Sequence, residues 1–207
     1  HVTVKSETTP LPLSLGEEHV LPDLSSLDNA LSFSTLKLAW NEAGLGLNLQ
    51  LTGRQQAPRC DPGSPETSDG LFLWIDTRNT QTIHRAGRFC HAFCFLPTGG
   101  GPEGSEAVAL PRAIGRAREE PPPPPPEALA AHSHVTDDGY QLDAWLGSSA
   151  LHGWEIDSGS STGVAARLGF YWSVHDSEQG DQVLSIPDEF PFAHDPSLWA
   201  TLELLHP

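Results

Sequence analysis

Four leucines alternate strictly with small or polar residues in LGLNLQLTG, residues 45–53. They are Leu45, Leu47, Leu49 and Leu51. A period of two places all four side chains on one face of a half-buried β-strand and argues against an amphipathic helix. The preceding LKLAW (36–40) is joined to this segment by the four-residue turn Asn41-Glu42-Ala43-Gly44, so the two segments predict a β-hairpin.

Short apolar segments of the same kind recur along the chain, and none shows a long helical period. We expect further strands at 71–77, 88–96, 140–146, 167–176, 181–186 and 198–204, with one helical turn near Ser148–Leu151. The connections are rich in turn residues, since the chain contains 19 Pro and 19 Gly. Many short strands separated by turns predict an all-β fold, an antiparallel β-sandwich of the jelly-roll or immunoglobulin-like type.

The 207 residues are enough for one large β-sandwich domain, which we place at 36–207. Residues 1–35 form an extended lead-in, because Pro10, Pro12 and Pro22 interrupt any helix. Residues 97–136 are predicted to be an irregular, proline-rich excursion of this domain, and a linker between two domains is the alternative. The run Pro121–Pro126 favours polyproline II within it. The chain begins at His1 and contains no Met, so we expect it to be a segment of a longer protein.

The charge distribution limits the choice of partner. The chain has 11 basic and 27 acidic residues, a net charge of −16, which argues against nucleic acid as a ligand. No stretch is long and apolar enough for a transmembrane helix, so we expect no membrane insertion. Every arginine except Arg167 lies between Arg54 and Arg118, which leaves the last third strongly acidic. That acidity serves solubility or binds a hard cation such as calcium.

The segment IHRAGRFCHAFCF (83–95) raises the question of a metal or redox site, because it holds two His, two Arg and two of the three Cys. Its apolar pattern favours a buried strand instead. On a strand, Cys90 and Cys94 lie about 13 Å apart. A disulfide requires Cα atoms within roughly 7 Å. We therefore interpret both cysteines as small buried hydrophobic residues.

Cys60 remains as a disulfide partner for one of these cysteines, and we favour Cys60–Cys90 over Cys60–Cys94. A zinc site formed by Cys60, His84 and Cys90 is the alternative, although the chain has no CxxC pair. A disulfide would favour an exported protein, and we lean towards a periplasmic or secreted location.

Polar side chains flank the two central predicted strands. Asp76 and Arg78 follow the first, and His84, Arg85 and Arg88 precede the second. If the strands form a hairpin, these groups converge at one end of the sheet. There they build either an ion-pair network or a polar site for hydroxyl or carboxylate groups of a ligand.

Catalytic motifs are weak in this sequence. Residues 159–163 (GSSTG) fit G-x-S-x-G, but a nucleophile elbow requires a preceding strand and a following helix, and here a strand follows. A two-carboxylate glycosidase stays open, although no acidic pair stands out.

The six tryptophans point to binding or to core packing. Trp74 shares a strand face with Phe72 and Asp76, and Trp145 shares one with Gln141 and Asp143. Such rings beside carboxylates and amides suit sugar stacking, and a second core face is the alternative.

Taken in order, five segments resemble the family 9 carbohydrate-binding modules and the wider DOMON-like sandwiches. They are 38–53, 68–78, 139–151, 167–178 and 195–204. Tyr140 and Asp143 stand at the Tyr and Glu of the family's Tyr-x-x-Glu-x-x-Ile-Pro pattern, whereas Leu146-Gly147 replaces Ile-Pro. Asp69, Asp76 and Asp176 fit its other acidic positions. HRAGRFCHAF and AIGRAREEPPPP lie outside the general pattern and look like features of a bacterial subgroup.

The resemblance implies a non-catalytic, carbohydrate-binding β-sandwich, often with structural calcium. We accordingly expect calcium at Asp69 and Asp176. The expected ligand-binding residues are Trp74, Asp76, Arg78, His84, Arg85, Arg88, His91 and Trp145. Some DOMON-like relatives bind haem, which here would need His84 or His91 as axial ligand. A haem- or metal-binding module and a structural domain of a larger envelope protein are the alternatives.

Overall fold

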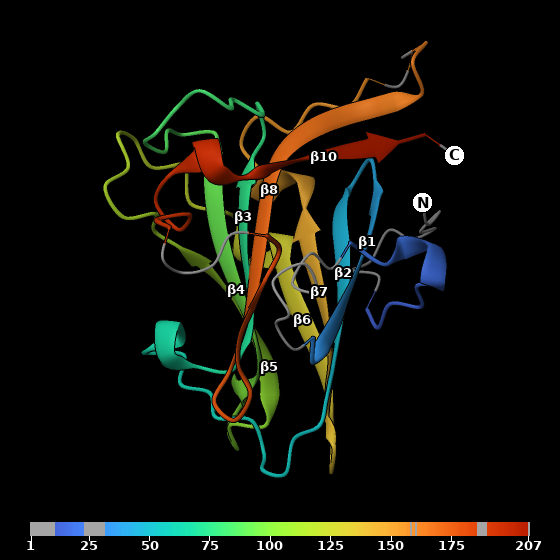
Figure 1. Cartoon of the computed structure of the whole chain (residues 1–207), viewed down its shortest axis with the longest axis vertical. Helices are drawn as coiled ribbons and strands as arrows, with labels where there is room; N and C mark the ends of the chain where they lie inside the picture. The colour runs from blue at the N-terminus through green and yellow to red at the C-terminus, as the bar shows by residue number, and fades with distance from the viewer. Residues whose placement is uncertain (1–10, 23–31, 158, 160, 186–189, 207) are drawn as a thin grey trace.

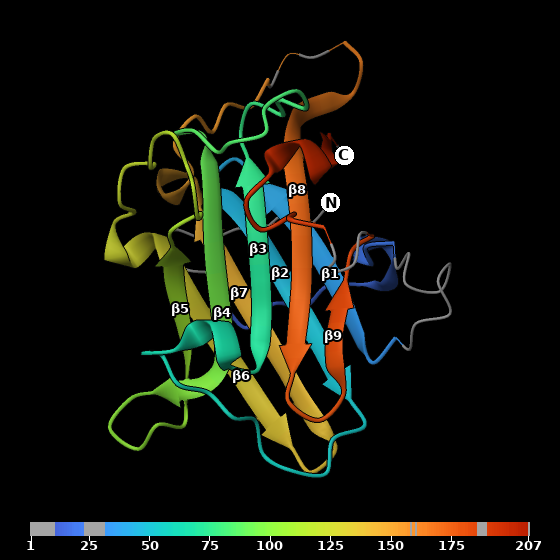
Figure 2. The same ribbon diagram turned by 60° about the vertical axis from the view of Figure 1, so that its left-hand side comes forward.

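The computed structural model describes residues 11–22, 32–157, 159, 161–185 and 190–206. Two antiparallel sheets face each other (Figures 1 and 2). The first sheet has the order β1-β2-β7-β6, formed by Ser34–Asn41, Gly44–Thr52, Gly139–Gly147 and Leu129–Thr136. The second has the order β10-β8-β3-β4-β5, formed by Ala200–Leu205, Val164–Asp176, Gly70–Asp76, Cys90–Gly100 and Glu106–Arg112, and β9 (Gly180–Val183) pairs with β8. The structure confirms the predicted antiparallel β-sandwich.

The core lies between the sheets, where the alternating residues of the central strands meet. The four leucines of β2 are at most 1% exposed, and Leu71, Leu73 and Ile75 of β3 are fully buried. At about 25 cal/mol per Å² of buried apolar surface, such a layer supplies most of the favourable folding free energy. The helical content described is limited to short 3-10 turns, at Glu17–His19 (η1), Pro65–Thr67 (η3), Pro126–Ala128 (η4), Ser148–Ala150 (η5) and Pro196–Leu198 (η6). Among the described residues, no helix is long and apolar enough to span a membrane.

Every strand predicted from the sequence is present, although β9 ends at Val183 rather than 186, which lies outside the described residues. The expectation of an irregular excursion at 97–136 is wrong, because this stretch contains β5 and β6 and the end of β4. β5 pairs with β4 at one edge of the second sheet, and β6 pairs with β7 at one edge of the first. The proline run therefore lies in a connection between the two sheets.

Part of the lead-in packs on the first sheet. Leu13 and His19 are buried, and Val20 forms a bridge with Lys37 of β1. Residues 1–10 and 23–31 of the predicted lead-in lie outside the described residues.

Candidate functional site

Three connections meet at one end of the sandwich, at the top of Figures 1 and 2, which we call the pocket end. Because Asp76 pairs with Cys90, the β3–β4 connection (77–89) starts and finishes here. The chain after β5 joins it, since Arg118 N donates to the carbonyl of Ala86 at 2.7 Å. The segment 190–199, which precedes β10, completes this end.

A hollow of about 360 Å³ lies where these connections meet. Its lining residues are His84, Arg85, Arg116, Pro191, His194 and Asp195. Two cationic side chains, two imidazoles and one carboxylate therefore surround a space of the size that small-molecule sites occupy.

The carboxylate of Asp195 is fixed by its neighbours. Oδ1 accepts hydrogen bonds from Ser197 N at 3.0 Å and Ser197 Oγ at 2.6 Å, which caps η6. His84 Nδ1 lies 3.1 Å from Oδ2. Burial raises the pKa of Asp195, but the hydrogen bonds from Ser197 and His84 outweigh burial, so its pKa lies below the ordinary value. Asp195 is thus ionised near neutral pH and engaged within the protein.

The other wall depends on an unusual backbone conformation. Arg116 has φ of 61°, the left-handed region that residues other than glycine adopt sparingly. Its carbonyl accepts a hydrogen bond from Arg85 Nε at 2.9 Å. At Gly115, an added Cβ would lie 2.7 Å from His194 Cε1, so the imidazole packs directly against this glycine.

Only His84 and Arg85 of the predicted ligand residues line this hollow. Asp76 is buried, and its carboxylate accepts hydrogen bonds from Arg78 N at 2.9 Å and Thr80 N at 2.6 Å, so it fixes the turn after β3. The side chains of Arg78 and Arg88 lie over the Phe89 ring. The polar groups thus converge at one end of the sheet, as predicted. However, Asp76 stabilises a turn, and Arg78 and Arg88 pack on Phe89 instead of lining the hollow.

Three further predicted ligand residues are buried elsewhere. Trp74 is 5% exposed and makes edge contacts with Tyr171 and Phe192. Trp145 is 7% exposed on the outer face of the first sheet, where it lies with Leu13 around Gly46. Both indoles are covered by segments far away in sequence, so the stacking surfaces predicted from strand alternation are not open.

His91, also proposed as a haem ligand, is committed to the interior. It is 2% exposed, stacks on Phe93, and its Nε2 lies 3.2 Å from the carbonyl of His152. Burial lowers the pKa of His91 to about 4, so the ring is neutral near neutral pH.

The predicted calcium ligands Asp69 and Asp176 do meet, at the opposite end of the sandwich, because Gly70 pairs with His175. The buried guanidinium of Arg54 forms ion pairs with both carboxylates. Burial lowers the pKa of Arg54, but Asp69 and Asp176 outweigh it and the pKa is raised. At this Arg54 end, an arginine side chain therefore supplies the positive charge. Among the described residues, no cluster of three or more His, Cys, Asp or Glu suits a metal ion.

The predicted Cys60–Cys90 disulfide is absent, and all three cysteines are free. Cys60 Sγ donates to the carbonyl of Asp69, before β3, whereas Cys90 pairs with Asp76 at the other end of β3. Seven residues of strand separate these points by about 23 Å. The prediction assumed that the loop before β3 lies near the start of β4, but antiparallel pairing places it near the end. Burial raises the pKa of Cys90 to about 12 and that of Cys94 to about 11, so both are protonated thiols.

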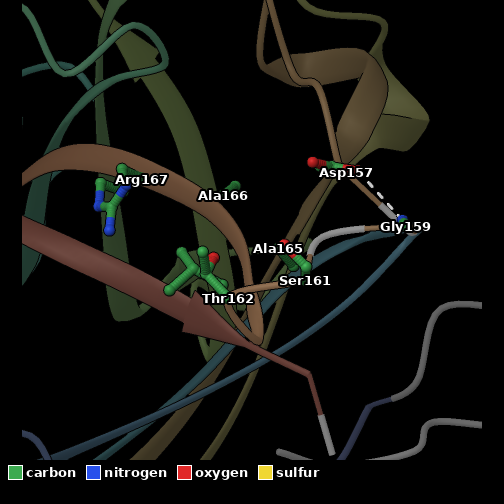
Figure 3. A pocket seen from close by; sticks show the side chains of 8 residues that line it. Asp157, Gly159, Ser161, Thr162, Ala165, Ala166 and Arg167 are labelled. Carbon is green, nitrogen blue, oxygen red and sulfur yellow. Dashed lines mark hydrogen bonds between the residues drawn. The ribbon is translucent and has the colours of Figure 1, made fainter.

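A second hollow, of about 560 Å³, lies beside the start of β8 (Figure 3). It includes part of the segment 159–163. This segment leads into the strand β8, whereas a nucleophile elbow would lead into a helix. The charged side chains of the hollow are already engaged, since Asp157 accepts from Gly159 N and Arg167 pairs with Glu203. This hollow offers fewer unengaged polar groups than the hollow at the pocket end.

Sequence reasoning missed four of the six residues that line the hollow at the pocket end: Arg116, Pro191, His194 and Asp195. They come from two connections that lie about 30 and 110 residues after His84, and no local motif links them. The DPS run at 195–197 is the one local signal, because Asp followed by Pro is typical of a helix start.

The sequence matches no protein-family model and no curated protein. The fold is similar to solved structures of a family 9 carbohydrate-binding module from Caldicellulosiruptor kristjanssonii, one in complex with cellotriose and one with glucose. Each has a TM-score of 0.55 and 13% identity to this chain. The likeness covers 83% of this chain and 74% or 75% of the neighbour, respectively. The chain thus has a fold like that of the family 9 carbohydrate-binding modules, as the order of its sequence segments predicted.

Proposed function

We propose that this chain is a non-catalytic carbohydrate-binding module whose ligand occupies the hollow at the pocket end. The observation that carries the proposal is a polar hollow, lined from three connections, on a sandwich like that of modules solved with cellotriose and glucose. Hydroxyl-rich ligands need several directional donors and acceptors, and imidazole, guanidinium and carboxylate groups supply both.

An exposed aromatic side chain that adjoins the lining in sequence also favours a sugar. Phe190 is 51% exposed and directly precedes Pro191 in the lining. Of the large hydrophobic side chains that are exposed among the described residues, Phe190 is the aromatic one. We assign to Phe190 the stacking role that the sequence suggested for Trp74 and Trp145.

The absence of catalysis in this proposal follows from the carboxylates. Glycoside hydrolysis ordinarily uses two carboxyl groups about 5–9.5 Å apart across the scissile bond. Among the described lining residues, Asp195 is the single carboxylate, and Ser197 and His84 engage it. This arrangement fits recognition better than proton transfer.

Calorimetric titration of the purified chain with a panel of neutral and acidic oligosaccharides tests the proposal. We expect saturable binding of one class without release of reducing ends. His194→Ala should weaken binding about fivefold, the effect of one lost hydrogen bond of about 1 kcal/mol. Phe190→Ala should weaken it as well, and His134→Ala, on the exposed face of β6, should bind like the wild type. A chain that binds no saccharide in the panel, or that hydrolyses one, contradicts the proposal.

A further inference from the structure

The two arginines of the hollow have no carboxylate partner among the described residues. Arg54, Arg78 and Arg167 all form ion pairs with Asp or Glu. Within the described ranges the other six arginines form no such pair: Arg59, Arg85, Arg88, Arg112, Arg116 and Arg118. Arg88 and Arg112 lie over the rings of Phe89 and Phe72, and Arg85 and Arg116 are the two that line the hollow. Because Arg85 and Arg116 line one hollow and no carboxylate of the described residues pairs with them, their positive charge is available to a ligand.

The local charge of the hollow is opposite to that of the chain. Two arginines and one carboxylate give the lining a charge of +1 with neutral imidazoles (2 − 1), whereas the whole chain carries −16. The negative charge of Asp195 is directed towards Ser197 and His84. Arg85 and Arg116 therefore form the cationic side of the hollow, where a ligand would meet positive charge.

A hydrogen bond links the Arg85 side chain to the backbone of Arg116. Arg85 uses Nε to bind the Arg116 carbonyl, so its two terminal nitrogens remain for a ligand. The left-handed backbone at Arg116 turns that carbonyl towards Arg85. A bound anion would be attracted by both positive charges that line the hollow and could accept charge-assisted hydrogen bonds from them.

We propose that the hollow selects saccharides bearing an anionic group, a uronic acid carboxylate or a sulfate ester, and that Arg85 and Arg116 bind this group. The inference rests on the proposed function and names its ligand class. Arginine suits the role because its planar donors match carboxylate and sulfate oxygens in pairs. Pro191 and the exposed Phe190 then face the apolar side of the sugar ring, and His194 is placed to bind hydroxyl groups.

Calorimetric titration with matched oligosaccharides tests this inference: an oligogalacturonate, a sulfated oligosaccharide and a neutral oligosaccharide of the same length. The variants are Arg85→Gln and Arg116→Asn, since asparagine tolerates the left-handed conformation. Arg59→Gln is the matched control, because Arg59 is exposed at the other end of the sandwich and its guanidinium donates a hydrogen bond to Gln56. Thermal unfolding of each variant verifies that it folds.

We expect the wild type to bind at least one acidic saccharide about tenfold or more tightly than the neutral one, as one charge-assisted hydrogen bond implies. Arg85→Gln and Arg116→Asn should each remove about tenfold of that affinity, whereas Arg59→Gln should not. Tighter binding of the oligogalacturonate or of the sulfated oligosaccharide identifies the anionic group as a carboxylate or a sulfate. Equal binding of acidic and neutral saccharides, or acidic binding that both variants retain, overturns the inference while the proposed function stands. Binding of no saccharide overturns both.

Discussion

At the Arg54 end, one guanidinium is buried between two carboxylates, whereas the two arginines that line the hollow at the pocket end are exposed and have no carboxylate partner among the described residues. The side chain of Arg54 is 1% exposed, and those of Asp69 and Asp176 are fully buried. Arg85 and Arg116 are exposed at the hollow. The same residue type therefore supports the fold at one end and is open to a ligand at the other.

The carboxylates explain why the Arg54 end stays closed. Asp69 accepts hydrogen bonds from Arg59 N and Ser177 N, and Asp176 accepts them from Glu178 N and Gln179 N. The network ties the loop before β3 to the β8–β9 turn. A buried charge is tolerated only where such partners replace water. At the pocket end, water or a ligand must supply them.

Arg54→Ala is the change with the largest expected effect. It leaves two buried carboxylates without their cation, which should lower the free energy of unfolding by about 3–5 kcal/mol. Urea denaturation followed by tryptophan fluorescence measures the loss. Arg59→Ala, an exposed neighbour, should change the free energy by about 0.5 kcal/mol or less. Equal losses for the two variants would show that burial of the ion pairs does not matter.

His91 offers a second test, because it is a buried titratable group that stays neutral rather than paired. Its pKa is about 4 in the folded chain against 6.5 ordinarily. The folded pKa is the lower one, so the unfolded chain takes up the proton first as pH falls, and stability is lost between pH 6.5 and about 4. The difference of about 2.5 pKa units corresponds to about 3 kcal/mol. The loss should be smaller in His91→Gln, whose amide can still donate to the His152 carbonyl.

Denaturation curves of both proteins from pH 7 to 4 measure this contribution as a difference. Taking the difference removes the other titrating groups that the two proteins share. If the stabilities of the two proteins changed in parallel with pH, the pKa of His91 would not be lowered by folding, contrary to its buried, stacked position.

The contrast between the two ends also shows what a sequence can reveal. Strict alternation in β2 and continuous apolar runs in β3 and β4 follow from burial, so these strands were predictable. β5 and β6 were missed because they are edge strands that are half-exposed or exposed along their length, and β5 contains Pro111, a residue untypical of strands. Edge strands bury too little to impose a period on the sequence.

For the candidate site, the local sequence pattern pointed to His84 and Arg85, which line the hollow, but it could not predict contacts between distant segments. Trp74 looked available because its strand face also carries Asp76, but Phe192 covers it from more than 100 residues away. Asp69 and Asp176 were expected to bind calcium, yet nothing local indicated that Arg54 would lie between them. In both cases, contacts between residues far apart in the sequence determined the environment of the side chain.

Gly115→Ala should alter the pocket end without destabilising the fold. The new Cβ would clash with the His194 ring, which is exposed and can rotate away, so the free energy of unfolding should change by about 0.5 kcal/mol or less. Saccharide affinity should fall several-fold, to a level near that of His194→Ala. Calorimetric titration of the single variants and the double variant tests the link, because the double variant should lose no more than His194→Ala alone. Additive losses would contradict a shared cause.

Arg78→Ala is the change with the smallest expected effect, and it tests whether pairing distinguishes the arginines. Arg78 also lies at the pocket end, but Glu155 accepts hydrogen bonds from both its terminal nitrogens, at 2.9 and 3.0 Å. These hydrogen bonds lower the pKa of Glu155, and the pair is exposed, so solvent screening leaves it little influence on stability. We expect an unfolding midpoint close to that of the wild type and an unchanged preference for acidic over neutral saccharides. Because Arg78 matches Arg85 in charge and in its end of the sandwich, a loss of that preference would show that position, rather than the absence of a carboxylate partner, determines which arginine binds the ligand.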